Sequence, residues 1–264
     1  LYSYQGKYAE AEPLYQRALA LREQTVGPNH PLMTVSLNNL ANLYLDQGKY
    51  VEAEPLYQRA LQISEQILGP DHLDVARPLN NLAELYRMQG KYVEAEPLYR
   101  RALHILNQAL GPDHPRVAGP LNGLANLSRE QGKNAEAEAL YQHARSIREQ
   151  SCGQEHPETA ETLHDLATFR QKQEKGSEAL SFAKRALSIR SQTLGDVHPK
   201  TVATRKLYAQ LVQEQARTTE ETAGEQGEER MAGACNEEHQ RDKASHPLHK
   251  EVDPSASEND PLQG

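Results

Sequence analysis

Apolar residues recur at helical spacing in two successive stretches of residues 70–110, the clearest example of a pattern that runs along most of the chain. The first stretch, Val75–Tyr86, places Val, Leu, Ala and Tyr side chains three or four positions apart, so that they share one face of a helix. A polar turn at Gln89–Lys91 interrupts the pattern, and a second apolar series occupies Tyr92–Leu110. The pattern predicts a first helix (helix A) and a second (helix B) that pack antiparallel, because the turn between them is too short for another arrangement.

The two-helix pattern repeats at an interval of 42 residues. Residues 47–61 and 89–103 agree at fourteen of fifteen positions, and one glycine and one histidine recur at that interval in five successive units. The glycines are Gly27, Gly69, Gly111, Gly153 and Gly195, and the histidines are His30, His72, His114, His156 and His198. A fixed period of a few tens of residues is typical of a solenoid, in which each unit buries its apolar face against its neighbours. We therefore expect an all-α solenoid of about five helix pairs over residues 1–217.

Both ends of the chain depart from the repeat. Residues 1–6 match only the last turn of a helix A, so we expect the chain to begin inside a repeat, as a fragment would. The glycine of the turn between the two helices becomes Glu174 in the fourth unit, a departure that suits a capping repeat. Residues 218–264 have no helical period and are rich in Glu, Ser, Gly and Pro, so we expect an acidic, disordered tail.

Charge is segregated between the repeats and the tail. Of the 37 acidic and 29 basic residues, twelve and four lie from Thr218 onward, which leaves 25 of each in the repeats. A neutral array without an Arg/Lys stripe lacks the electrostatic footprint of a nucleic-acid-binding protein. No apolar run is long enough to span a membrane or to form a secretion signal, so we expect no membrane partner and a cytoplasmic location.

The stretch Leu79–Leu103 resembles a tetratricopeptide repeat. Its signature positions hold Leu82, Ala83, Tyr86, Gly90, Tyr92, Ala95, Tyr99 and Ala102. The 42-residue length and the LNNLA and QGKY motifs resemble the long variant found in kinesin light chains, nephrocystins and many bacterial repeat proteins. The resemblance implies a right-handed superhelix whose A helices line a concave groove that binds a peptide segment of a partner protein. Self-association through an open N-terminal face around Leu14, Tyr15 and Leu19 is a further possibility.

The resemblance also indicates which polar side chains point into the groove. The candidates for peptide binding are Asn38, Asn39, Asn42, Arg77, Asn80, Asn81, Glu84, Arg87, Asn122, Asn126 and Arg129, with His164, Asp165 and Thr168 in the fourth unit. Asn39 and Asn81 are favoured, because kinesin light chains use the second Asn of LNNLA in this way. Selectivity is expected from charges that differ among units, including Arg170 and Asp46. The Lys/Asn/Arg clamp of chaperone-binding members is not present.

Two interpretations of the recurrent asparagines remain open. Asn is a poor helix former, so its repeated presence in helix A asks for a reason. A ladder of side-chain amides can match the N–H and C=O groups of an extended peptide. Alternatively, the amides bond between adjacent A helices and align the repeats.

The periodic histidines do not indicate a metal site. One ligand per repeat would lie too far from the next to share an ion, whereas four of the five precede Pro, which favours the first position of a helix. No phosphate loop, nucleophile elbow or metalloprotease motif is found, so we expect neither a cofactor nor an enzyme. The sequence predicts a non-catalytic interaction scaffold. The alternatives are the C-terminal regulatory repeats of a longer signalling ATPase and a kinesin-light-chain-like cargo adaptor.

Overall fold

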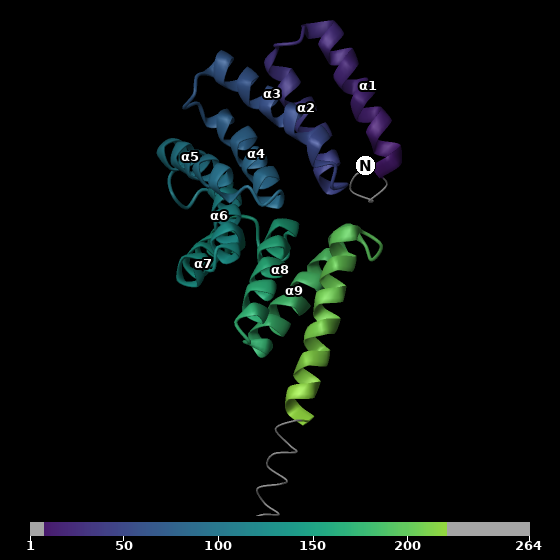
Figure 1. The fold of residues 1–264 in the computed structure, drawn as a ribbon, viewed down its shortest axis with the longest axis vertical. Helices are drawn as coiled ribbons and strands as arrows, with labels where there is room; N and C mark the ends of the chain where they lie inside the picture. Colours follow the sequence, from purple (N-terminus) through teal and green to yellow (C-terminus); the bar gives the residue numbers. More distant parts are fainter. Residues whose placement is uncertain (1–7, 221–264) are drawn as a thin grey trace, which may run out of the picture. The chain divides into compact units, whose positions relative to one another are not determined.

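The computed structural model describes residues 8–220, and this part of the chain is built from helices (Figure 1). The α-helices are Tyr8–Val26 (α1), Pro31–Asp46 (α2), Tyr50–Leu68 (α3), Ala76–Met88 (α4), Tyr92–Leu110 (α5), Ala118–Glu130 (α6), Asn134–Ser151 (α7), Pro157–Lys172 (α8) and Gly176–Leu194 (α9). Two short 3-10 helices, Leu73–Val75 (η2) and Pro115–Val117 (η3), precede α4 and α6. A final helix occupies residues 199–220.

The helices pack as the predicted antiparallel pairs. Within the described residues, α2 pairs with α3, α4 with α5, α6 with α7 and α8 with α9. Helix α1 packs on α2, and the final helix packs on α8 and α9 through Leu207 and Leu211. Each pair also packs against the next, so the all-α solenoid predicted from the 42-residue period is confirmed. No helix in residues 8–220 is long and apolar enough to cross a membrane.

The turn inside each pair requires a left-handed residue. Gly48, Gly90 and Gly132 have φ of 73–75°, a conformation that glycine adopts without strain. The following lysine then donates its backbone N–H to a carbonyl in the last turn of helix A, as Lys91 does to Tyr86 at 2.8 Å. Glu174 takes the same conformation with φ 60°, so the fourth unit keeps the turn despite having lost the glycine.

The periodic histidines lie at the starts of the A helices, as predicted, and the structure shows how they act there. In each unit the histidine Nδ1 accepts the backbone N–H two residues further on, at 3.1–3.3 Å. The ring thereby satisfies one of the N–H groups that a helix start leaves without an intrahelical partner.

Proline inside two A helices changes how they begin. Pro78 and Pro120 lie in the first turn of α4 and α6, and each is preceded by a 3-10 segment. Proline has no N–H to donate and its ring clashes with the carbonyl four residues earlier, so the regular α-helix begins only at Ala76 and Ala118. In α2 and α8, Ser36 and Thr162 hold the same position, and these helices begin directly at Pro31 and Pro157.

Small and large residues alternate in the core between the helices. Ala53, Ala95 and Ala137 are fully buried near the start of successive B helices, where they let the neighbouring helices approach closely. Tyr57, Tyr99 and Tyr141 are also fully buried and fill the spaces between units. Burial of both kinds repeats with the 42-residue period.

The chain divides into a unit of residues 1–215 and a second unit of residues 216–264. The repeats and all residues of the site below belong to the first unit. Residues 218–220, predicted as the start of the disordered tail, still belong to the final helix. The rest of the predicted tail, residues 221–264, lies outside the described residues, as does the start at residues 1–6.

Candidate peptide-binding groove

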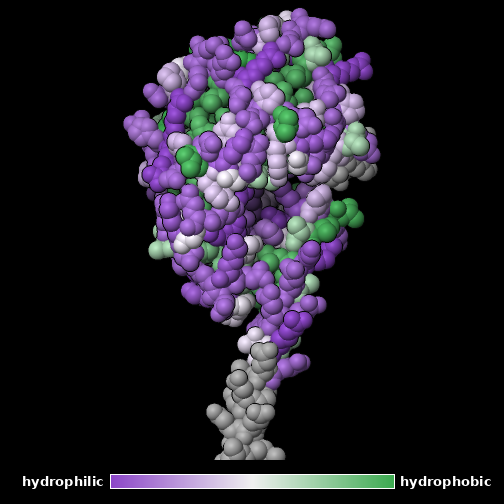
Figure 2. Space-filling view, viewed as in Figure 1, coloured by the Kyte–Doolittle hydropathy of each residue, from purple (hydrophilic) through white to green (hydrophobic). Residues whose placement is uncertain are grey.

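A groove runs across the A helices of successive units. Its lining comes mainly from α2, α4, α6, α8 and the start of the final helix, with one residue from each of α3, α5, α7 and α9, and its volume is about 610 Å³. Figure 2 shows a mostly hydrophilic surface that is hollowed in the middle of the repeats. The residues that line the groove are Asn42, Leu45, Asp46, Tyr57, Asn80, Asn81, Glu84, Arg87, Met88, Tyr99, Gly119, Asn122, Gly123, Asn126, Arg148, Glu161, His164, Asp165, Arg190, Lys200 and Ala203.

The tyrosines of the B helices support the groove from below. In three successive units, the hydroxyl group of the buried tyrosine donates a hydrogen bond to a polar side chain on helix A of the same unit. Tyr57 donates to Asn42, Tyr99 to Glu84 at 2.5 Å and Tyr141 to Asn126 at 2.6 Å. Burial raises the pKa of Tyr99, so its hydroxyl stays protonated and remains a donor.

Side-chain amides connect neighbouring A helices. The Asn81 Nδ2 donates to the Asn38 Oδ1 at 2.9 Å, and this bond joins α4 to α2. The amides of Asn122 and Asn126 both donate to Asp165 Oδ2, at 2.7 and 3.0 Å, and join α6 to α8. These are the contacts expected if the asparagines align the repeats.

A charged cluster connects α4 to α6. Two nitrogens of Arg87 bond to the Glu84 carboxylate at 2.6 and 3.0 Å, and a third forms an ion pair with Glu130. Burial alone would lower the pKa of Arg87, but the hydrogen bonds and the charge of Glu84 raise it above its usual value. Arg129 also pairs with Glu130, at 3.4 Å. This cluster is a fixed part of the groove wall, because each of its charges has a partner.

The predicted site residues fall into distinct places. Nine of them line the groove together, namely Asn42, Asn80, Asn81, Glu84, Arg87, Asn122, Asn126, His164 and Asp165. Thr168 does not line it and donates its hydroxyl to the His164 carbonyl at 3.1 Å. Asn39 lines a recess at the groove's end, and Asn38 and Arg77 line a separate cavity between α2, α3 and α4. Arg129 is not among the residues that line the groove, and it pairs with Glu130.

Arg170 does not lie in the groove, contrary to the expectation. It occupies the position held by Tyr44 and Tyr86 in earlier units, and only 4% of its surface is exposed. Its guanidinium pairs with Glu138 at 2.5 Å and with Glu178 at 2.9 Å, and so connects α7 to α9. Position within the repeat, rather than charge, decides on which face a side chain lies.

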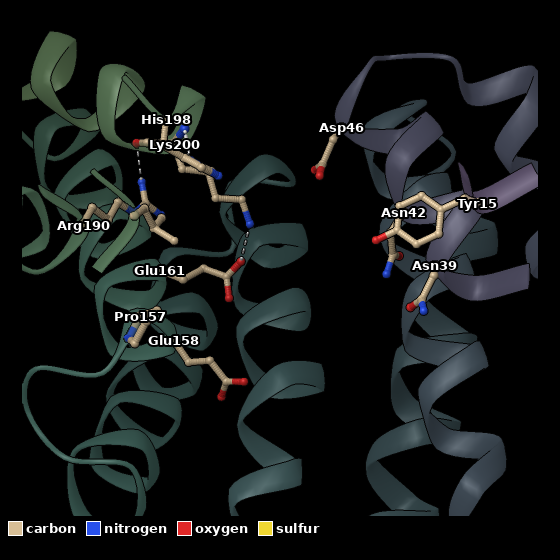
Figure 3. A pocket seen from close by; sticks show the side chains of 11 residues that line it. Tyr15, Asn39, Asn42, Asp46, Pro157, Glu158, Glu161, Arg190, His198 and Lys200 are labelled. Carbon is tan, nitrogen blue, oxygen red and sulfur yellow. Dashed lines mark hydrogen bonds and ion pairs between the residues drawn. The ribbon is translucent and has the colours of Figure 1, made fainter. Parts of the chain in front are cut away.

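The recess at the groove's end brings the first and last complete units together. Its volume is about 290 Å³, and Figure 3 shows Asn39, Asn42 and Asp46 of α2 on one side with Glu161, Arg190 and Lys200 on the other. Glu161 forms an ion pair with Arg148 at 3.2 Å and lies 4.0 Å from Lys200. Asp46 extends into the space opposite Glu161 and Lys200 (Figure 3).

A cysteine, a histidine and a glutamate lie close together near the junction of α7 and α8. One ligand atom each of Cys152, His156 and Glu158 lies within 4.8 Å of the others. The His156 Nδ1 already accepts the backbone N–H of Glu158 at 3.3 Å, which leaves only Nε2 for a metal. Three side chains at a partly exposed helix start could hold an ion only with further ligands from solvent.

Sequence reasoning missed the tyrosine supports. A signal was present, since Tyr57, Tyr99 and Tyr141 each stand fifteen residues after a polar residue of helix A. It also could not tell which charged side chains of the groove form ion pairs, because these pairings depend on contacts between units. Asp165 was recognised as a groove residue, but not as the acceptor of two amides.

Comparisons with known proteins agree with this architecture. A family model described as tetratricopeptide repeat matches residues 1–53, 32–108, 79–150, 116–168 and 158–221. No curated protein matches the chain.

Among solved structures, the chain is similar to a Podosopora anserina protein described as "kinesin light chain nearly identical TPR-like repeats". The two are 26% identical with a TM-score of 0.52, over 73% of this chain and 91% of that one. BtubC (BKLC) from P. vanneervenii shares the fold, with 20% identity and a TM-score of 0.55 over 97% of this chain and 99% of that one. The expected resemblance is thus confirmed, and the chain belongs to the tetratricopeptide repeat family.

Proposed function

We propose that the protein is a non-catalytic interaction scaffold that binds a peptide segment of a partner protein in the groove. The single observation that carries the proposal is the groove itself, lined by polar side chains from each successive A helix. Repeated helix pairs supply equivalent positions along an extended ligand, which is how solenoids build long concave binding surfaces. Side-chain amides and carboxylates there can meet the N–H and C=O groups of a peptide backbone.

The experiment is a selection of random peptides on the full chain, repeated with variants that obstruct the groove. Gly119 lines the groove, and a Cβ added there would meet no atom within 4 Å. Gly119→Trp should therefore fill the groove without disturbing the fold, while Gly119→Ala should leave it open. Val93→Trp, at a position 85% exposed on α5 and outside the groove lining, is the matched bulky control.

We expect peptides selected on the unaltered chain to bind Gly119→Ala and Val93→Trp equally well and to lose affinity for Gly119→Trp by about tenfold or more. Circular dichroism and melting of each variant should first show an unchanged fold. Equal binding to Gly119→Trp would place the ligand elsewhere and contradict the proposal.

Two asparagine variants distinguish peptide contact from alignment. Asn81→Ala breaks the bond to Asn38 and should lower the free energy of unfolding by about 1 kcal/mol. Asn39 makes no side-chain hydrogen bond within the described residues, so Asn39→Ala should leave stability within about 0.5 kcal/mol of the unaltered chain. If Asn39 contacts the peptide, its loss weakens binding at unchanged melting temperature. Unchanged affinity would remove Asn39 from the peptide site.

A further inference from the structure

Asp165 is a carboxylate in the groove whose charge no cation in residues 8–220 neutralises by contact. Its hydrogen-bond donors are the neutral amides of Asn122 and Asn126, at 2.7 and 3.0 Å. Burial would raise the pKa of Asp165, but nearby His164, the two amide bonds and Arg129 outweigh it and lower the pKa. The carboxylate is therefore ionised at neutral pH while it forms no ion pair.

The nearby arginines are engaged elsewhere. Arg190 donates to the Thr204 hydroxyl at 2.5 Å and to the Lys200 carbonyl at 3.0 Å, and Arg148 pairs with Glu161 at 3.2 Å. Arg129 pairs with Glu130 at 3.4 Å. A buried or half-buried charge is favourable only when it is paired or well hydrogen-bonded, so Asp165 has capacity for a further, cationic partner.

Next to Asp165 lies a second hydrogen-bond acceptor without a partner in the described part of the chain, the side-chain oxygen of Asn122. Because an ionised carboxylate can only accept, Asn122 must turn its NH₂ group toward Asp165 and its carbonyl oxygen away. That Oδ1 atom is buried and has no hydrogen-bond partner within the described residues, and Asn122 as a whole is only 5% exposed. By contrast, the Asn126 Oδ1 accepts from Tyr141. The unsatisfied Oδ1 of Asn122 therefore also lacks a donor, which is a costly condition for a buried acceptor.

The helix that carries Asn122 leaves room for an incoming side chain. Helix α6 has Gly119 and Gly123 where α4 has Arg77 and Asn81. The ring of Tyr99 occupies the space beside Gly123, but a Cβ at Gly119 would meet nothing within 4 Å. Gly119, Asn122 and Asp165 all line the groove. A side chain of a ligand can therefore reach Asn122 and Asp165 by passing over Gly119, which has no side chain to obstruct it.

We propose that Asp165 and Asn122 together receive the cationic side chain of an arginine or lysine in the peptide segment that occupies the groove. The inference rests on the proposed function and adds the chemistry of its ligand. A guanidinium offers five N–H donors in a planar fork, so it can bond a carboxylate and an adjacent amide oxygen at once. Arginine is accordingly preferred to lysine, whose ammonium is a compact point charge.

The test uses a variant that the repeat already contains. Asn39 and Asn81 hold the position of Asp165 in the first two units, so Asp165→Asn removes the charge and keeps a side chain that fits this place. Random octapeptides are selected on the full chain, on Asp165→Asn and on Asp113→Asn. Asp113 is an exposed loop carboxylate that pairs with His143 outside the groove, and it serves as the matched control.

Peptides selected on the unaltered chain and on Asp113→Asn should carry a basic residue at one fixed position, and those selected on Asp165→Asn should not. Asp165→Glu, which retains the charge, should keep the preference. For one selected peptide, replacing its basic residue by Gln and Asp165 by Asn should each weaken binding about tenfold, and both changes together should weaken it scarcely more.

The outcomes separate this inference from the proposed function. Peptides that bind in the groove but show no basic position, or that bind Asp165→Asn equally well, overturn the inference and leave peptide binding in place. Additive effects of the two replacements also overturn it, because the two groups then do not interact. If no peptide binds any form of the chain, peptide binding itself fails, and this inference fails with it.

Discussion

Individual side chains decide whether a repeat position is open to a ligand or closed by a neighbour. Gly119 and Gly123 share one face of α6, yet their surroundings differ. A Cβ at Gly123 would lie 2.2 Å from the Tyr99 ring, closer than atoms can approach, whereas at Gly119 it would meet nothing within 4 Å. Gly123 is therefore required by packing, and Gly119 leaves space in the groove.

Gly123→Ala should destabilise the protein, because Tyr99 is fully buried and must move to make room. Overpacking of this kind costs about 1–3 kcal/mol, so we expect a clear decrease in the denaturant midpoint. Gly119→Ala is the matched control, and it should be neutral or stabilising by up to about 1 kcal/mol, since Ala favours a helix over Gly. Equal stability of the two variants would show that the Tyr99 ring yields without cost.

His164 makes stability depend on pH. Burial and the positive charges of Arg190 and Arg129 lower the pKa of His164. The negative charges of Asp165 and Glu161 raise it, but by less, so the pKa lies below its usual value. The unfolded chain then binds the proton more readily than the folded one, so stability is complete above the unfolded pKa and is lost as pH falls below about 6.5.

Asn38, Asn80 and Asn122 hold the position of His164 in the earlier units, so His164→Asn should be accepted by the fold. We expect the fall in melting temperature between about pH 7.5 and about pH 5 to be smaller in this variant than in the unaltered chain. The pKa of His198 is also lowered, by burial and by Lys200 and Arg190, so some pH dependence should remain. Identical pH profiles would show that His164 titrates alike in the folded and unfolded chain.

At the scale of the helix, one pair of positions varies together from unit to unit. Arg22, Arg148 and Arg190 near the ends of B helices each bond the hydroxyl fourteen residues further on, at 2.5–2.6 Å. The hydroxyls belong to Ser36, Thr162 and Thr204. In the two remaining units the arginine becomes Ser64 or Leu106, and the hydroxyl residue becomes Pro78 or Pro120. A serine or threonine thus stands at this position of helix A wherever an arginine stands fourteen residues before it.

Ser64 leaves the space near it unfilled. It lines a cavity of about 540 Å³, together with apolar side chains that include Val35, Ile63 and Ile67. In the next unit Leu106 occupies the equivalent position and is buried, with Pro120 in place of Pro78. Ser64→Leu therefore copies a combination that the fold already accepts.

We expect Ser64→Leu to stabilise the protein by about 0.5–2 kcal/mol, as cavity-filling substitutions commonly do. Ser64→Ala is the control, because it removes the hydroxyl that donates to the Ala60 carbonyl at 3.0 Å and fills nothing. Thermal melting compares the three proteins. A leucine variant no more stable than the alanine variant would mean that the side chain points out of the cavity.

The sequence predicted the helix pairs well because their signals are local and repeated. Apolar spacing located both helices of each unit, and the glycine turn fixed their antiparallel packing. The 3-10 starts at Leu73–Val75 and Pro115–Val117 could have been read from Pro78 and Pro120. The bonds from Asn122 and Asn126 to Asp165 could not be predicted, because they depend on the offset between adjacent units rather than on the pattern within one.

At the scale of the whole array, within residues 8–215, the first and last complete units line one recess. No sequence signal predicts this approach, because it results from small rotations added over successive repeats. A solenoid holds its ends only through neighbour contacts, so the separation of the ends should respond to modest forces. The charges on the two sides of the recess supply such a force.

Asp46→Lys should widen the recess, because it places a second cation opposite Lys200. The distance between spin labels at Val51 and Val197 measures the change, since both positions are more than 80% exposed and lie close in sequence to Asp46 and Lys200. Cys152 and Cys235 are first replaced by Ser. We expect a longer distance at low salt and a smaller effect at about 1 M salt, where the Debye length falls to about 3 Å.

The charge swap Asp46→Lys with Lys200→Asp restores opposite charges across the recess and should bring the distance back toward that of the unaltered chain. A shift that persists in the swap would reflect local unfolding rather than repulsion. If neither the single variant nor the salt concentration changes the distance, the end units are held by packing alone. Because the same recess closes one end of the groove, a wider separation should also speed peptide release, which stopped-flow dissociation of a selected peptide would detect.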